Sequence, residues 1–112
     1  MQVNVREERG VAVLTGPEEL DAAIAPELDQ ALGDAMAAEK KRIVIDLEAT
    51  SFIDSSGLAA LVRALKRARA AGGNVALAGL QPPVQKVFEL TRLDKAFDIF
   101  GDSGEAVRSL AG

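Results

Sequence analysis

The chain has 112 residues, of which 48% are hydrophobic and 27% charged, a balance typical of one soluble globular domain with its own core. Its 17 acidic and 13 basic residues give a formal net charge of -4, which disfavours direct binding to nucleic acid. The sequence contains no cysteine and no histidine, which excludes disulfides, thiolate catalysis and any histidine-dependent triad or metal site. Because it has no basic leader and no run of about 18 apolar residues, we expect a cytoplasmic protein without membrane insertion.

The first predicted elements form a β-hairpin. Val3 and Val5 alternate with polar residues, charged residues and Gly10 follow, and residues 11–14 are apolar. This pattern predicts two strands joined by a turn.

A helix and a central strand come next. Pro26 can occupy the first turn of a helix, which we expect to run to about Glu39. Its apolar face is formed by residues three and four apart, namely Leu28, Ala31, Leu32, Ala35 and Met36. Residues 42–47, RIVIDL, are β-branched and almost continuously apolar, which predicts a strand buried on both faces.

A second helix is predicted from the serine pair Ser55 and Ser56 to Gly72-Gly73, where glycine supplies a left-handed stop. Its apolar side consists of Leu58, Leu61, Val62 and Leu65. Its basic residues, Arg63, Lys66, Arg67 and Arg69, come late in the helix. Cations there complement the negative end of the helix dipole, which favours a solvated face over a nucleic-acid stripe.

The last elements alternate in the same way. Residues 74–80, NVALAGL, predict a buried strand, and Pro82-Pro83 can start a third helix. Residues 96–100, AFDIF, predict a short strand. Asp102 and Glu105 have the spacing of a capping box at the start of a fourth helix.

The order of elements predicts the fold class. Strands that alternate with helices imply right-handed crossovers and an α/β fold. We expect a mixed, mostly parallel β-sheet of about five strands, with the hairpin strand at one edge and four helices packed mainly on one face.

The segment Asp54-Ser55-Ser56-Gly57 stands where the central strand region gives way to the second helix. Read locally, an Asp or Ser at such a junction is a helix cap, because the first backbone N–H groups of a helix lack intrahelical partners. A nucleophile elbow would require G-x-S-x-G together with a histidine, and the sequence has neither. Two interpretations remain open, a structural cap or a functional serine.

The wider sequence resembles a known family. Residues 51–100, from SFIDSSGLAALV through QPPVQKVFEL to AFDIF, are similar to the STAS domain of bacterial anti-sigma factor antagonists. That family has a Phe-apolar-Asp-Ser-Ser/Thr-Gly-Leu segment before a helix, then a Val-x-x-Val/Leu-Phe helix and a Phe-x-Ile-Phe close. The upstream residues 14–28 resemble its Leu-Thr-Gly-Glu-Leu-Asp and Ala-Pro-x-Leu segments, so we expect residues 1–112 to form a single STAS domain.

The resemblance implies a switchable binding module and not an enzyme, with no catalytic residue, cofactor or metal. In the family, an anti-sigma factor serine kinase phosphorylates the first serine of the pair, which corresponds to Ser55. The unphosphorylated form binds that kinase and releases the sigma factor, and a PP2C-type phosphatase resets the switch. The resemblance also implies partner-binding roles for Asp21, Asp54, Ser56 and Gly57, the last because a small residue lets a partner's backbone approach.

One departure and two alternatives accompany the resemblance. The family passes directly from Thr-Gly to Glu-Leu-Asp, whereas TGPEELD carries two more residues before Asp21, including Pro17. A STAS adaptor subunit of a transport or lipid-trafficking complex, without a phospho-switch, is the alternative function. A nucleotide-binding protein is a third, although the sequence lacks G-x-x-x-x-G-K.

Overall fold

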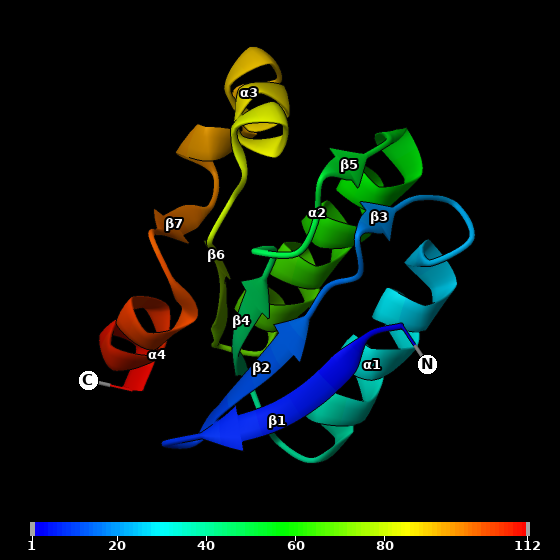
Figure 1. Cartoon of the computed structure of the whole chain (residues 1–112). Helices are drawn as coiled ribbons and strands as arrows, with labels where there is room; N and C mark the ends of the chain where they lie inside the picture. Colours follow the sequence, from blue (N-terminus) through cyan, green and yellow to red (C-terminus); the bar gives the residue numbers. More distant parts are fainter. Residues whose placement is uncertain (1, 112) are drawn as a thin grey trace.

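The computed structural model describes residues 2–111, which form the α/β arrangement of Figure 1. The strands are β1 (Asn4–Glu8), β2 (Val11–Thr15), β3 (Glu19–Leu20), β4 (Arg42–Asp46), β5 (Phe52–Ile53), β6 (Asn74–Ala78) and β7 (Asp98–Phe100). The helices are α1 (Ala25–Ala37), α2 (Ser55–Ala70), α3 (Pro82–Leu90) and α4 (Ser103–Ala111), with a 3-10 turn at Leu93–Lys95. Within the described residues, no helix combines the length and apolar character needed to cross a membrane.

The main sheet has five strands in the order β1-β2-β4-β6-β7. Strand β1 is antiparallel to β2 and forms one edge, whereas β2, β4, β6 and β7 run parallel. The predicted mixed, mostly parallel sheet with the hairpin strand at its edge is therefore confirmed. Because β2 and β4 are parallel neighbours, their carboxyl ends lie at the same edge of the sheet, and the segments that follow them start side by side.

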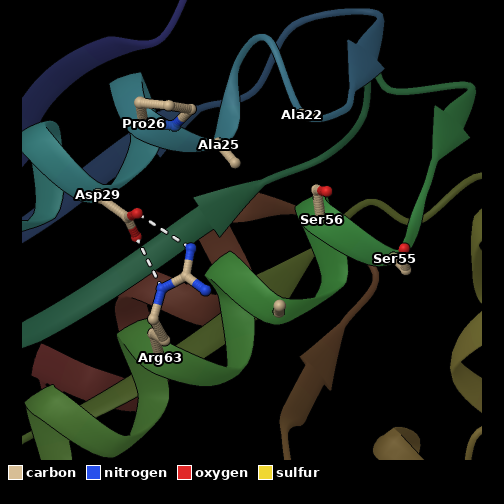
Figure 2. Close-up of a pocket in the computed structure, with 8 residues that line it drawn as sticks. Ala22, Ala25, Pro26, Asp29, Ser55, Ser56 and Arg63 are labelled. Carbon is tan, nitrogen blue, oxygen red and sulfur yellow. Dashed lines mark hydrogen bonds and ion pairs between the residues drawn. The ribbon is translucent and has the colours of Figure 1, made fainter.

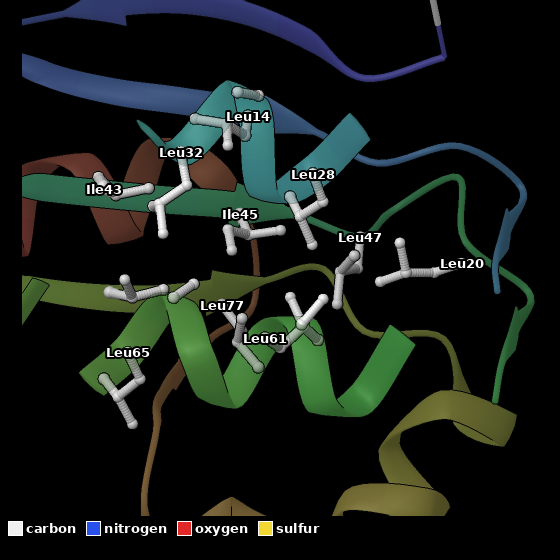
Figure 3. Close-up of a cluster of buried hydrophobic side chains, with 14 of the residues drawn as sticks. Leu14, Leu20, Leu28, Leu32, Ile43, Ile45, Leu47, Leu61, Leu65 and Leu77 are labelled. Atoms are coloured by element: carbon white, nitrogen blue, oxygen red, sulfur yellow. The ribbon is translucent and has the colours of Figure 1, made fainter. Parts of the chain in front are cut away.

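Both faces of the sheet are covered, and successive residues of each central strand alternate between the two faces. One face packs against α1 and α2, as Figure 3 shows for the side chains of Leu14, Ile43, Ile45, Leu77, Leu28, Leu32, Leu61 and Leu65. The opposite face, with Val13, Val44 and Ala76, packs against Ala106 and Val107 of α4. Burial on both sides explains the continuous apolar run of β4. Helices α1, α2 and α3 all contribute to the larger core and α4 alone to the smaller one, so the predicted packing of the four helices mainly on one face is confirmed.

Helix α3 extends the larger core beyond the end of the sheet. Val84 and Phe88 are buried there, and the ring of Phe88 meets that of Phe97 edge to face, with centroids 5.8 Å apart. This pairing holds α3 close to the start of β7, and aromatic edge-to-face contacts are favourable beyond the area they bury.

The predicted element boundaries hold to within one or two residues. Helix α2 ends before Gly72, whose φ of 85° supplies the left-handed stop, and the strand at 74–78 ends at Gly79, with φ of 71°. The carboxylate of Asp102 accepts the N–H of Glu105 at 2.8 Å, which confirms Asp102 as the cap of α4. The sequence pattern did not indicate the two-residue strands β3 and β5, which pair with each other in a second, parallel sheet.

Candidate functional site

The site is built where the segments after β2 and β4 meet. In Figure 1 the short strands β3 and β5 lie beyond the ends of β2 and β4. Their register pairs Glu19 with Phe52 and Leu20 with Ile53, and the N–H of Asp54 donates to the carbonyl of Leu20 at 3.2 Å. The loop before α1 and the start of α2 are therefore neighbours, as the parallel order of β2 and β4 predicts.

The cap of α2 is the side chain of Asp54. Asp54 has an extended backbone, and its Oδ1 accepts the N–H of Gly57 at 2.9 Å, which satisfies one of the unpaired donors at the helix start. Ser55 and Ser56 occupy the first two helical positions and are not the cap. Among residues 2–111 neither serine hydroxyl makes a hydrogen bond, and the cap is Asp54, so the local interpretation of the serines as caps does not account for them.

The two serines differ in exposure. Ser55 is exposed and Ser56 is half-buried, so the predicted position of the pair at the exposed start of the second helix is confirmed. An exposed hydroxyl at this position can accept a group from an external enzyme. It has no base of its own, because no side chain of the described residues bonds to it.

Gly57 is glycine for a reason internal to the chain. A Cβ built on this buried residue would lie 2.2 Å from the carbonyl oxygen of Leu20, far inside van der Waals contact. The close backbone approach expected from a partner is thus made by the chain itself, at β3. Gly57 allows the start of α2 to pack against the loop that carries Asp21.

A cavity of about 350 Å³, open to the surface, lies between the starts of α1 and α2 (Figure 2); we call it the serine cavity. It is lined by Ala22, Ala25, Pro26, Asp29, Ser55, Ser56, Ala59 and Arg63. At its end, Nη2 of Arg63 lies 3.0 Å from Oδ2 of Asp29, and Nε lies 3.4 Å from Oδ1. Both charged side chains are partly exposed, so the pair contributes about 1 kcal/mol at most to stability.

Arg63 has a different role from the one predicted from the sequence, which was that of a solvated cation complementing the helix dipole. It belongs to the basic cluster of α2, yet it pairs with Asp29 of α1, 34 residues earlier in the chain, and borders the serine cavity. The spacing of seven residues from Ser56, close to two helical turns, was a signal that the two side chains share a face. The partner carboxylate was not visible in any local pattern.

Asp21 lies on the expected loop but does not line the serine cavity. Its Oδ1 accepts the N–H groups of Ala23 at 3.0 Å and Ile24 at 3.3 Å, which shapes the turn into α1. It instead borders a smaller cavity of about 210 Å³, together with Glu18 and Glu19. The turn from Asp21 to Ala25 therefore separates an acidic hollow from the serine cavity.

Within residues 2–111, no three carboxylates gather closely enough to hold a metal ion. The chemistry that the site offers is recognition and group acceptance, through an exposed hydroxyl, a half-buried hydroxyl and flanking carboxylates.

Comparisons with known proteins identify the family of the chain. The family model of the STAS domain matches residues 2–106. The anti-sigma-F factor antagonist RsfB of Mycobacterium tuberculosis is 31% identical over an alignment 117 residues long, gaps included. The alignment covers 98% of this chain and 89% of that protein. The crystal structure of an anti-sigma factor antagonist from Mycobacterium paratuberculosis is 29% identical, with a TM-score of 0.85 over 98% of this chain and 93% of that one.

The fold is shared more widely. The phosphorylated form of SpoIIAA, a Bacillus cell fate determinant, superposes with a TM-score of 0.76 at 22% identity, covering 96% of this chain and 97% of that one. At that identity the likeness concerns the fold alone. From the family model and the RsfB match, the chain belongs to the STAS domain family of anti-sigma factor antagonists.

Proposed function

We propose that this protein is an anti-sigma factor antagonist that is switched by phosphorylation of Ser55. In its unphosphorylated form it binds an anti-sigma factor serine kinase in the cytoplasm and thereby releases a sigma factor. The observation that carries the proposal is the exposed hydroxyl of Ser55 at the first position of α2, beside the loop that leads into α1; among residues 2–111 this hydroxyl makes no hydrogen bond.

The domain tolerates a phosphate at Ser55. Phosphoserine carries a charge of about -1.5 to -2 at neutral pH, and the start of a helix favours an anion. Ser55 is exposed, so the phosphate remains hydrated in the isolated chain. Phosphorylation therefore leaves the fold intact and acts on the partner.

The partner surface does not tolerate the same group. A partner that covers the neutral hydroxyl would, after phosphorylation, bury a charge beside the carboxylate of Asp54. An uncompensated buried charge costs about 4 kcal/mol, which corresponds to a loss of affinity of about a thousandfold.

The partner covers the surface that carries Asp21, Asp54, Ser55 and Ser56, which extends from the serine cavity to the acidic hollow beside Asp21. Gly57 contributes indirectly, by holding the start of α2 against Leu20. The kinase binds Mg-ATP, transfers its γ-phosphate to Ser55 with release of ADP, and provides the catalytic base, since no side chain among residues 2–111 bonds to the Ser55 hydroxyl. A PP2C-type phosphatase removes the phosphate. The chain itself turns over no substrate.

A release assay tests the proposal. A labelled sigma factor bound to the cognate anti-sigma factor kinase is titrated with the purified chain, with and without Mg-ATP. We expect the chain to displace the sigma factor and to lose this ability after incubation with Mg-ATP, whereas Ser55→Ala continues to displace it. Failure of the unphosphorylated wild-type chain to displace the sigma factor would contradict the proposal.

A further inference from the structure

Thr50 is a polar residue with no exposed surface, in the turn between β4 and β5. Its Oγ1 donates to the carbonyl oxygen of Pro17 at 2.6 Å, across 33 residues of sequence. Pro17 lies in the loop between β2 and β3, four residues before Asp21. The bond therefore joins the loop before Asp21 to the segment that leads into α2.

The loop is otherwise held by backbone hydrogen bonds and by one long, exposed bond from the Ser51 hydroxyl to the Glu18 carbonyl, at 3.5 Å. The carbonyl of Glu18 accepts the N–H groups of Ser51 at 2.9 Å and Phe52 at 3.3 Å, and the carbonyl of Leu20 accepts that of Asp54 at 3.2 Å. Many sequences can make such bonds. The bond from the Thr50 hydroxyl is buried and requires a side-chain hydroxyl at this position. We therefore expect the placement of the loop to depend on the identity of residue 50.

The hydroxyl is also packed closely. A Cβ on Gly16 would lie 3.1 Å from Oγ1 of Thr50, and the N–H of Gly16 is bound to the carbonyl of Asp46 at 2.9 Å. Water has little room to replace the hydroxyl. Without it, the buried carbonyl of Pro17 would lack a donor unless the loop moved outward to reach solvent.

We propose that Thr50 is a positioning residue that holds residues 16–21 against the start of α2, and that the affinity for the partner depends on this hold. The inference rests on the proposed function for its partner. Asp21 and Ser55 lie on the two segments that the Thr50–Pro17 bond joins. If the loop moves outward, the partner must close it again before binding, which lowers the apparent affinity.

The variants Thr50→Val and Thr50→Ser separate the hydroxyl from packing. Valine keeps the shape of threonine and removes the hydroxyl, whereas serine keeps the hydroxyl and removes the methyl group. In Thr50→Val we expect amide hydrogen exchange at Ser51, Phe52 and Asp54 to accelerate about fivefold to a hundredfold, as the loss of a buried hydrogen bond predicts. In Thr50→Ser exchange at these amides stays close to that of the wild type.

Binding to the anti-sigma factor kinase gives the second readout. We expect Thr50→Val to raise Kd by about threefold or more, and Thr50→Ser to restore it, because only the competent fraction of the loop binds. Val107→Ala is the control for general destabilisation, since Val107 belongs to α4 and packs against the opposite face of the sheet. It lowers stability without changing Kd or the three loop amides.

The outcomes separate the two proposals. Unchanged exchange in Thr50→Val, or faster exchange with unchanged Kd, would overturn the inference. An equal rise of Kd in Val107→Ala would also overturn it, because the effect would then follow global stability. If the wild-type chain does not bind the kinase, the proposed function fails, while the exchange data still decide whether Thr50 holds the loop.

Discussion

Gly57→Ala should destabilise the protein although it replaces a glycine inside a helix. Alanine in a helix is usually favoured over glycine by about 0.5–1 kcal/mol. Here the added Cβ would lie 2.2 Å from the carbonyl oxygen and 2.9 Å from the carbonyl carbon of Leu20. Ordinary contact begins at about 3.4 Å, so backbone must move by about 1 Å to admit the methyl group.

The backbone in the way is itself held. Leu20 is 1% exposed, and its carbonyl accepts the N–H of Asp54. Overpacking of this kind costs about 1–3 kcal/mol, which exceeds the gain in helix propensity. We therefore expect Gly57→Ala to lower the free energy of unfolding by about 1–2 kcal/mol.

Urea denaturation followed by circular dichroism measures this change, and Gly33→Ala is the matched control. Gly33 lies in α1, and the nearest atom to its added Cβ is Nη2 of the flexible Arg67 side chain, at 3.4 Å. Gly33→Ala should stabilise the protein by about 0.5–1 kcal/mol. A Gly57→Ala variant as stable as the wild type, or stabilised like Gly33→Ala, would refute the packing of α2 against Leu20.

Three further predictions concern the residues around the site. Asp54→Ala should lower the free energy of unfolding by about 0.5–2 kcal/mol because it removes the cap, whereas Ser55→Ala should change it by less than about 0.5 kcal/mol; equal losses in urea denaturation would contradict the assignment of the cap. Arg63→Gln should cost at most about 1 kcal/mol, and the difference should shrink in 1 M NaCl; a loss that salt does not reduce would show a role beyond the ion pair. Asp21→Lys should weaken kinase binding in calorimetry more than Arg69→Glu, because Arg69 lies in the last turn of α2, far from the serine pair, where it donates to the carbonyl of Ala96. Equal effects would reject the proposed interface.

Much of the fold was predictable because its signals are local. The apolar run of β4 and the three- and four-residue spacing of α1 and α2 each reflect a buried face, and Gly72 ends α2 through its left-handed backbone. The two-residue strands β3 and β5 were not predictable, since two residues cannot show a periodic pattern.

The site was predictable in part. The serine pair falls at a helix start because apolar spacing changes there, but the cap could not be assigned among Asp54 and the serines, since a shift of one residue exchanges their positions. The contact of Gly57 with Leu20 and the pair of Arg63 with Asp29 join residues more than 30 positions apart. Such contacts depend on how the elements pack and leave no local signature.

The most direct test of the central claim locates the phosphate. The wild-type chain, Ser55→Ala and Ser56→Ala are incubated with the cognate kinase and Mg-ATP and are analysed by phosphopeptide mass spectrometry. We expect phosphate on Ser55 in the wild type and in Ser56→Ala, and none in Ser55→Ala, because Ser55 is the exposed serine of the pair. Phosphate on Ser56, or on neither serine, would contradict this claim.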